Sequence, residues 1–392
     1  MNPRVVNTPS LRVGLSTTTA EPVLTGGRLD GLGVYSRALL DHLPHAGVEA
    51  LPFSFAPPGD ARRLTVGRAL PLSFPLATLG DLILPSSVHL STRAVLGKGA
   101  APLDIFHATD YRIVRMDCPV VATLHDALPI SHPEWASPKL RGLKNWLQIK
   151  AARKPQHVIT GSHFSIRELV ECFGVDEGKI SVVHHGVAAH WFDAPSVEER
   201  DATLAQYQLQ AGYFLFVGTL QPRKNVGRLL EAYLGLPPVL RSKHQLVIVG
   251  APGWRSEELV AQIKAAQQNG ENVAWLDQLT DDRQLRHLYA GAGAFVFPSL
   301  HEGFGLPLVE AFASGVPVAC SGTTSLPEVA QGAALEFDPL SVGEITAAMT
   351  TLARDDTVRA RCIAAGLRRA LELTWDEAAR RSVAVYHEVL SH

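Results

Sequence analysis

The chain has 392 residues, of which 46 % are hydrophobic and 19 % charged, and its net charge is −2. This length suits two domains better than one, and the composition is that of a globular protein rather than a disordered one. A net charge near zero provides no global basic field, so we expect no nucleic-acid partner. The four cysteines are scattered without a CxxC pair. That spacing argues against a zinc site or a disulfide framework and favours a reducing compartment.

The N-terminal sequence lacks the long apolar core of a signal peptide. No segment reaches the ~20 apolar residues that a membrane-spanning helix needs. The nearest candidate, residues 69–90, is interrupted by three prolines and Asp81. We interpret it as loop and short helix, and we expect a cytoplasmic protein.

Short apolar runs alternate with amphipathic segments along the chain. The candidate strands are residues 11–16, 104–109, 119–125, 157–162, 180–186, 213–219, 245–250, 272–277, 294–300 and 317–322. Helical patterns lie between them, for example at 33–43, 165–174 and 226–235. Ser165-x-x-Glu168 predicts a capping-box start for the second of these helices, and Gly174 predicts its end. Alternation of strands and helices predicts parallel sheets with helices on both faces.

A polar segment near the midpoint, residues 190–212, interrupts the alternation, which then restarts. We therefore predict two doubly wound domains, residues 1–198 and 199–375. Ligands of such sheets bind beyond the carboxyl ends of the strands, which here means a cleft between the domains. The last helix places Trp375, Val383 and Tyr386 on one apolar face that needs a partner surface.

Residues 299–315, SLHEGFGLPLVEAFASG, carry two carboxylates eight positions apart. Glu302 should leave the carboxyl end of a buried strand on a glycine loop, and Glu310 should lie in the helix that follows. Gly303 and Gly305 let backbone N–H groups approach a ligand closely. The carboxylates suit the hydroxyl groups of a sugar and a ribose. The alternative for either glutamate alone is an ordinary solvated or helix-start residue.

A second group of candidate residues lies in 216–233, FVGTLQPRKNVGRLLEAY. Arg223 and Lys224 stand just before a helix, where adjacent cations oppose the helix dipole. Their position is more readily understood if they hold phosphate. An isolated Arg-Lys pair is more often a solvated surface feature.

Three weaker signals have structural alternatives. Gly33 precedes a helix, but Ser36 stands where a dinucleotide-binding motif has its third glycine. His125 leaves a strand, where a lone histidine is more often structural. Ser325 and Glu328 follow a strand near the C-terminus, where N-capping is the ordinary explanation.

Together these motifs resemble glycosyltransferase family 4. The resemblance is carried by GTLQPRKN, HEGFGLPLVEAFASGVPV and SLPEV, in this order and spacing, and by GLGVYS, TLHD, ITGSHFS and VVHHGV in the first half. It extends from about Leu11 to Leu390. The family's fold is GT-B, an α/β architecture of two Rossmann-like domains facing across a cleft. The resemblance implies that the C-terminal helix, about 376–392, packs back on the first domain.

The resemblance also implies roles for the candidate residues. Catalytic residues at the transferred sugar would be His125 and Glu302. The donor diphosphate would lie at Arg223, Lys224 and Gly33, and the nucleotide ribose at Glu310. The loops of the donor site would contain Gly303, Phe304, Gly305, Leu306, Ser325 and Glu328. The sequence departs from many members at Thr219, where they have an arginine that contacts phosphate.

We therefore expect a retaining, metal-independent glycosyltransferase with no cofactor. The expected donor is a nucleotide sugar, with GDP-mannose favoured, and the acceptor is a glycan or a lipid-linked glycan in polysaccharide biosynthesis. The alternatives are a nucleotide-sugar epimerase of the same fold and a non-catalytic nucleotide- or carbohydrate-binding module.

Residues 138–154, PKLRGLKNWLQIKAARK, carry six cations and no acidic residue. Leucines and Trp146 recur at helical spacing, so the segment predicts a basic amphipathic helix. Such a helix suits an anionic membrane surface, and residues 139–154 could make peripheral contact with the inner face of the membrane. The alternative is a core helix whose lysines extend into solvent.

Overall fold

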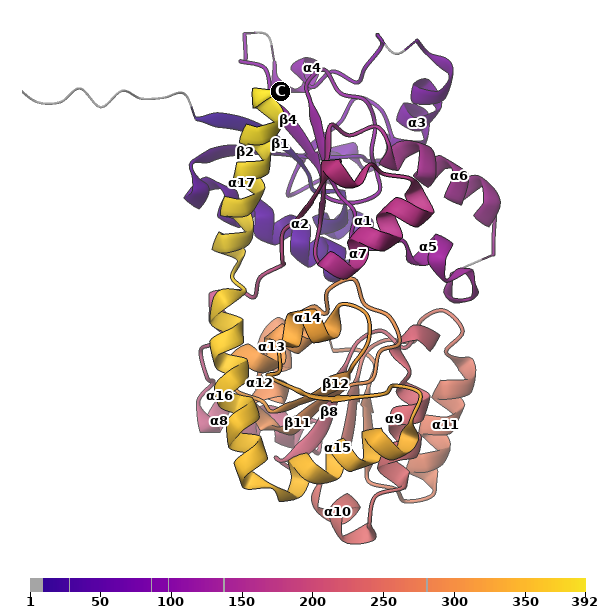
Figure 1. Ribbon diagram of the computed structural model, residues 1–392, viewed down its shortest axis with the longest axis vertical. Coiled ribbons are helices and arrows are strands. Elements are labelled where there is room, and N and C mark those ends of the chain that lie inside the picture. The colour runs from indigo at the N-terminus through magenta and orange to yellow at the C-terminus, as the bar shows by residue number, and fades with distance from the viewer. Residues whose placement is uncertain (1–9, 28, 86, 98, 137, 280) are drawn as a thin grey trace, which may run out of the picture.

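The computed structural model describes residues 10–27, 29–85, 87–97, 99–136, 138–279 and 281–392. Two lobes are stacked along the long axis of the molecule, and each contains a parallel sheet (Figure 1). The first sheet has seven strands in the order β3-β2-β1-β4-β5-β6-β7, and the second has six in the order β10-β9-β8-β11-β12-β13. Two doubly wound parallel sheets confirm the predicted α/β fold class.

All ten predicted strands are present. The strands of the first sheet are β1 (Leu11–Ser16), β2 (Val48–Ser54), β3 (Arg68–Ala69), β4 (Ile105–Ala108), β5 (Val120–Thr123), β6 (His157–Thr160) and β7 (Ile180–Val182). Those of the second are β8 (Tyr213–Val217), β9 (Leu246–Val249), β10 (Val273–Leu276), β11 (Ala292–Phe297), β12 (Val318–Ser321) and β13 (Leu335–Phe337). The three strands that the sequence did not predict, β2, β3 and β13, lie toward the sheet edges, where apolar runs are interrupted or short.

Helices surround both sheets. Those of the first lobe are α1 (Pro22–Thr25), α2 (Gly31–His42), α3 (Phe74–Ile83), α4 (Arg93–Leu96), α5 (Leu128–Ser131), α6 (Arg141–Ala152) and α7 (His163–Glu168). Those that follow are α8 (Val197–Gln206), α9 (Val226–Leu234), α10 (Pro238–Lys243), α11 (Glu257–Gln268), α12 (Asp282–Gly291), α13 (Leu306–Ala313), α14 (Leu326–Ala330), α15 (Val342–Arg354), α16 (Asp356–Glu372) and α17 (Trp375–Ser391). In the second lobe α9 packs on α11 and α15, whereas α12 packs on α8 and α13 packs on α16.

Burial on both faces explains why the strands are continuous apolar runs. In β4, Ile105 belongs to the buried cluster that includes Val13 and Tyr386. The next residue, Phe106, belongs to the cluster on the other side, with Phe53 and Phe173. Successive side chains of a strand point to opposite faces, so both must be apolar when helices cover both faces.

The predicted start of the helix after β6 was wrong. Ser162, not Ser165, is the N-cap residue of α7, and its hydroxyl accepts a hydrogen bond from the backbone N–H of Ser165. Glu168 therefore does not close a capping box, and its carboxylate bonds to His301 of the second lobe instead. The predicted end was correct, because Gly174 adopts the left-handed conformation that terminates this segment.

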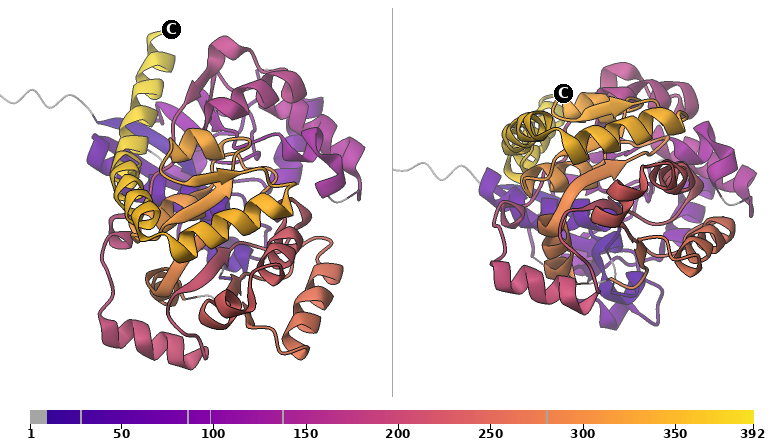
Figure 2. Two further views of the ribbon diagram at one scale, coloured as in Figure 1. Left: turned by 60° about the horizontal axis from the view of Figure 1, so that its bottom comes forward. Right: turned by 90° about the horizontal axis from the view of Figure 1, so that it is seen from below.

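The chain passes between the lobes twice, and the two passages lie side by side. The N–H of Val187 donates to the carbonyl of Leu373 at 2.9 Å, and Val187 forms a β-bridge with Thr374. After the second passage α17 packs on α2 and the turn Leu43–Ala46. Trp375 and Tyr386 lie in the buried cluster of the first sheet. The α16–α17 pair thus runs along one side of the molecule from the second lobe to the first (Figure 1), and it lies at the edge of the molecule when seen from below (Figure 2).

Candidate functional site

Glu302 lies on the loop between β11 and α13, as the sequence predicted. Its backbone N–H donates to the hydroxyl of Thr324, and its carbonyl accepts from the hydroxyl of Ser325 at 2.8 Å. Gly305 has a φ of +99°, a conformation that glycine adopts without strain, and starts α13 from this loop. The loop after β12 therefore fixes the backbone of Glu302.

The carboxylate of Glu302 is paired with both predicted phosphate cations. Lys224 Nζ donates to Glu302 Oε1 at 2.5 Å, and Arg223 Nη1 donates to Glu302 Oε2 at 3.1 Å. Arg223 also donates to the carbonyl of His301 at 2.9 Å. The three charges therefore form one cluster at the ends of β8 and β11.

Lys224 is buried, with 7 % of its surface exposed. Its ammonium group lies over the ring of Phe297 and against Glu302. Burial lowers the pKa of Lys224, and Glu302 offsets part of that effect. Burial also raises the pKa of Glu302, but the charges of Lys224 and Arg223 outweigh it and hold that pKa below its ordinary value. Glu302 is therefore a carboxylate at neutral pH and cannot act as a general acid.

Glu310 lies in α13, well inside the helix, and is separate from this cluster. The hydroxyl of Tyr289 donates to Glu310 Oε2 at 3.2 Å. Burial and the nearby negative charge of Asp282 raise the pKa of Glu310 to about 7. The pKa of Glu302 is therefore lowered and that of Glu310 is raised, although both lie in the 299–315 segment.

The first lobe meets the Glu302 loop at the end of β5. The carbonyl of His125 lies so close to Gly303 that a Cβ atom there would be 2.3 Å from it. The ring of His125 donates from Nε2 to the carbonyl of Thr109 at 3.1 Å, and Nδ1 faces His185 Nε2 at 3.1 Å. Burial lowers the pKa of His125, so its imidazole is neutral. The structure thus brings His125 and the Glu302 loop together across the boundary between the lobes.

Gly33 lies in the first turn of α2, in contact with a neighbouring backbone. A Cβ atom there would be 2.6 Å from the carbonyl of Thr19, so only glycine fits. The N–H of Gly33 donates to the carboxylate of Asp30, which caps the helix. This N–H is therefore already bonded within the protein and would have to exchange Asp30 for a phosphate.

Glu328 makes contacts that the donor-site prediction did not include. Its carboxylate accepts from the N–H groups of His163 and Phe164, which begin α7 of the other lobe. It also contacts the rings of His163 and His184 at 2.9 and 2.8 Å. Burial opposes ionisation of Glu328, but these hydrogen bonds lower its pKa to about 2. Glu328 thus connects the two lobes.

Other contacts between the lobes surround the same loop. Ser162 donates to the carbonyl of Gly303 at 2.8 Å, and His301 Nε2 bonds to Glu168 Oε1 at 2.8 Å. Phe304 is buried against the ring of His185. Leu306 packs partly against the apolar clusters of both lobes. The sequence reasoning missed His301 as a site residue, although it stands next to Glu302.

A groove of about 1170 Å³ lies between α9 and α11 of the second lobe, and its lining includes Gln221, Pro222 and Asn225, which flank Arg223 and Lys224. None of the predicted donor-site residues lines it. The buried charge cluster lies at the carboxyl ends of the strands, which is where ligands of doubly wound α/β sheets bind.

Comparison with known proteins agrees with this architecture. The model of the family described as Glycosyltransferase Family 4 matches residues 29–191, and that of Glycosyl transferases group 1 matches residues 201–369. O-antigen chain mannosyltransferase B of Escherichia coli is 32 % identical over 286 residues, which cover 72 % of this chain and 74 % of that protein. The chain belongs to glycosyltransferase family 4. It is therefore a sugar-transferring enzyme.

Further relatives extend the match. The MMP alpha-(1->4)-mannosyltransferase of Mycolicibacterium hassiacum is 27 % identical over 328 residues, 78 % of this chain and 76 % of that protein. Among solved structures, sucrose-phosphate synthase from Thermosynechococcus elongatus superposes with a TM-score of 0.73 at 19 % identity, covering 97 % and 99 % of the two chains. Anabaena Alr3699/HepE in complex with UDP and glucose gives a TM-score of 0.71 at 17 % identity, covering 97 % and 99 %. At these identities the structures show the GT-B fold alone.

Within the described ranges, no helix combines the length and the apolar character needed to cross a membrane.

Proposed function

We propose that this family 4 enzyme transfers mannose from GDP-mannose, with retention of configuration, to a glycan or lipid-linked glycan in polysaccharide biosynthesis. The donor sugar is supported by relatives that are named mannosyltransferases, two of which match over about three quarters of their own length. The observation that carries the proposal for the chemistry is the Glu302–Arg223–Lys224 cluster beside His125. The donor would lie where these groups meet.

The charges of the cluster suit cleavage of a sugar–diphosphate bond. The leaving diphosphate gains negative charge, which Arg223 and Lys224 would stabilise, and Glu302 leaves this trio with a net charge of +1. The sugar carbon gains positive charge, which the ionised carboxylate of Glu302 would stabilise. In the described chain Arg223 and Lys224 pair with one carboxylate, Glu302, rather than with the close pair of a retaining glycosidase. We therefore propose same-face attack with the leaving phosphate taking the acceptor's proton.

His125 and Gly33 would have to adjust to the donor. Both ring nitrogens of His125 are engaged by Thr109 and His185, so a contact with the sugar requires one of these bonds to open. For the ribose, Glu310 would accept hydrogen bonds as a carboxylate, which its raised pKa makes dependent on pH. These roles rest on the family motif and on the positions of the residues.

We further propose that transfer needs neither a metal ion nor another cofactor. In the described chain, neither Glu302 nor Glu310 belongs to a group of three metal-type ligands whose donor atoms lie within 4.8 Å of one another. The charge that a metal would supply at the diphosphate is available from Arg223 and Lys224.

We also propose that the enzyme works on a membrane-bound acceptor through α3 and α6. Ile83 of α3 is 70 % exposed, and Leu143 and Trp146 of α6 are 55 % and 44 % exposed, so these side chains are not core residues. Asp81 of α3 pairs with Lys154, two residues after the end of α6, and Figure 1 draws both helices on the same side of the first lobe. An exposed apolar surface with neighbouring lysines suits an anionic bilayer.

A panel of nucleotide sugars tests the donor. We expect GDP-mannose to raise the thermal unfolding midpoint most, since a ligand at ~100 times its Kd adds ~2.7 kcal/mol. Stabilisation by a UDP- or ADP-sugar alone would contradict the donor assignment.

Incubation with donor alone separates the functional classes. A transferase gives slow hydrolysis at most, an epimerase converts the donor fully without acceptor, and a binding module does neither.

A further inference from the structure

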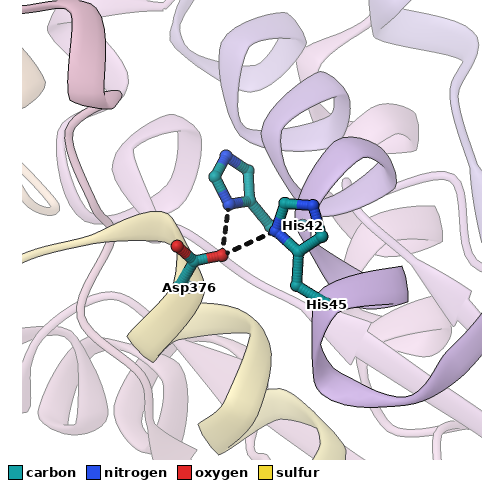
Figure 3. A group of neighbouring side chains, drawn as sticks. All are labelled: His42, His45 and Asp376. Carbon is teal, nitrogen blue, oxygen red and sulfur yellow. Dashed lines mark hydrogen bonds and ion pairs between the residues drawn. The ribbon is translucent and has the colours of Figure 1, made fainter.

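Two histidines of the first lobe and one aspartate of α17 converge outside the proposed donor site (Figure 3). His42 is the last residue of α2, His45 lies in the turn Leu43–Ala46, and Asp376 lies in the first turn of α17. His42 Nδ1 is 2.7 Å and His45 Nδ1 is 3.0 Å from the same oxygen, Asp376 Oδ1. The spacing of three residues places both rings on one side of the turn.

We propose that His42, His45 and Asp376 form a zinc-binding site that fastens α17 to the first lobe. Their donor atoms all lie within 4.8 Å of one another. Imidazole nitrogen and carboxylate oxygen are the zinc ligands of many three-residue protein sites, at ~2.0–2.2 Å from the ion. Tetrahedral ligands at such bond lengths are roughly 3.4 Å apart, so each histidine nitrogen would have to move less than about 1 Å away from Asp376 Oδ1. Water would complete the coordination.

Hydrogen bonding explains the convergence of His42, His45 and Asp376 less well than a bound metal ion does. The His45 side chain is 66 % exposed, and exposed pairs of this kind contribute ~0–1 kcal/mol because water and salt screen them. A divalent ion would instead join three groups from two parts of the chain separated by 331 positions. Because metal binding to the folded state is coupled to folding, it would stabilise the docked position of α17.

Two other groups of three in the described chain have suitable ligand types. His163, His184 and Glu328 form one, and His132, Glu168 and His301 form the other. Glu328 already accepts two backbone hydrogen bonds at the start of α7, and Glu168 accepts from the N–H of Ala127 as well as bonding to His301. A metal would have to break these contacts between and within the lobes. Asp376 has no such backbone commitment among the described contacts, so we assign the zinc to its cluster.

The site would be structural and separate from sugar transfer. α17 begins at the second passage between the lobes, where Thr374 pairs with Val187. Zinc at its first turn would hold the start of the helix against α2, next to that passage. The proposal does not depend on the identity of the donor or the acceptor.

The experiment uses the full-length protein, stripped with a chelator and then titrated with zinc chloride. We expect about one zinc per chain after gel filtration, measured by atomic emission, and a higher thermal unfolding midpoint. Cobalt in place of zinc should give the visible absorption of a tetrahedral site. Asp376→Asn keeps an oxygen that can accept hydrogen bonds, so it should unfold like the stripped wild type. Its zinc affinity, and that of His45→Ala, should fall at least about tenfold.

His190→Ala is the matched control, because His190 pairs with Asp282 at 3.3 Å but belongs to none of the three groups of metal-type ligands in the described chain. It should bind zinc like the wild type. Two results would overturn the proposal: no zinc remaining on the wild type after gel filtration, or unchanged zinc content and cobalt spectrum in Asp376→Asn and His45→Ala. The second result would place the ion at one of the other two clusters, and loss of zinc in either His163→Ala or His132→Ala would show which.

Discussion

At the scale of single residues, the proposed chemistry depends on a buried charge cluster whose members need each other. Glu302 is held by Lys224 at 2.5 Å, and both are almost fully buried. Removing one partner leaves the other charged and without compensation, which costs about 3–5 kcal/mol in buried pairs. Arg223 remains near Glu302, so the cost here should be smaller.

A double-mutant cycle tests this dependence. We expect Lys224→Ala to lower the free energy of unfolding by about 1–3 kcal/mol and to weaken donor binding. Combining it with Glu302→Gln should cost less than the sum of the two single changes, because no unpaired carboxylate remains. Denaturant unfolding of the four proteins measures the coupling. Strict additivity would mean that the ion pair does not stabilise the fold.

Glu302→Gln should also separate turnover from binding. Since the carboxylate is proposed to act at the sugar carbon, kcat should fall by about 10²-fold or more while free GDP binds nearly as before.

Glu310 predicts a pH dependence with a definite sign. Burial and Asp282 raise its pKa to about 7, and the ribose hydroxyls need its ionised form. Nucleotide affinity should therefore rise from pH 6 to pH 8. Between about pH 4.5 and 7 the folded state binds the proton more tightly than the unfolded state, so this group's contribution to stability falls as pH rises. Calorimetric titration with GDP measures the affinity.

Glu310→Gln is the control for that dependence. It should bind GDP more weakly than wild type at pH 8 and show little change between pH 6 and pH 8. A wild-type pH profile in the variant would remove Glu310 from the ribose site.

Residue types and spacing predicted which side chains gather here but not how they pair. Glu302, Arg223 and Lys224 were recognisable from their motifs, and their positions at strand ends were predictable from the alternation of elements. The ion pair joins residues 78 positions apart, and its burial depends on Phe297 and on the loop after β12. Such a contact depends on tertiary packing, which no local pattern contains.

At the scale of elements, α7 connects the lobes through its N-terminus. Its first N–H groups are satisfied by Ser162 from its own lobe and by Glu328 from the other. The sequence pattern pointed to a capping box within the chain segment. A capping carboxylate supplied from 165 positions away could not be predicted from it.

Glu328→Gln distinguishes two roles for that side chain. As a contact between the lobes, its loss should lower the free energy of unfolding by roughly 0.5–2 kcal/mol, as for other helix caps, with free GDP binding unchanged. As a donor contact, its loss should weaken nucleotide-sugar binding. Glu336→Gln, an exposed change in β13, is the control. Unchanged stability with weaker donor binding would favour the donor role.

At the scale of the whole molecule, Gly186 lies where the two passages between the lobes touch. A Cβ atom there would be 2.1 Å from the backbone nitrogen of Trp375. Gly186→Ala must therefore push the passages apart, at a cost of about 1–3 kcal/mol. Gly227→Ala, in α9, would meet only an ordinary contact at 3.7 Å and should be neutral or stabilising. Thermal unfolding compares them, and equal midpoints would mean that the passages shift freely.

At the same scale, the exposure of α6 bears on the two interpretations of residues 139–154. The core interpretation required the apolar side of α6 to be covered, but Leu143 and Trp146 are exposed. The structure also reduces the number of available cations. Lys154 pairs with Asp81, and Arg153 donates to the carbonyl of Phe173, whereas Lys144 and Lys150 are exposed on α6. Amphipathic periodicity alone could not show which side of the helix the first lobe would cover.

Vesicle sedimentation tests the proposed membrane contact. Each lysine near an anionic surface contributes ~1 kcal/mol, so Lys144→Glu with Lys150→Glu should reduce partitioning to anionic vesicles at least about 30-fold. Binding should weaken with added salt, and donor hydrolysis should be unchanged because neither lysine is near the proposed donor site.

Lys243→Glu with Lys264→Glu makes the same charge change on exposed positions of the second lobe and should sediment like wild type. If both double variants lose vesicle binding equally, the protein's net charge rather than α6 would account for the binding. If the wild type binds neutral and anionic vesicles equally, the apolar side chains of α3 and α6 would make the contact without help from the lysines.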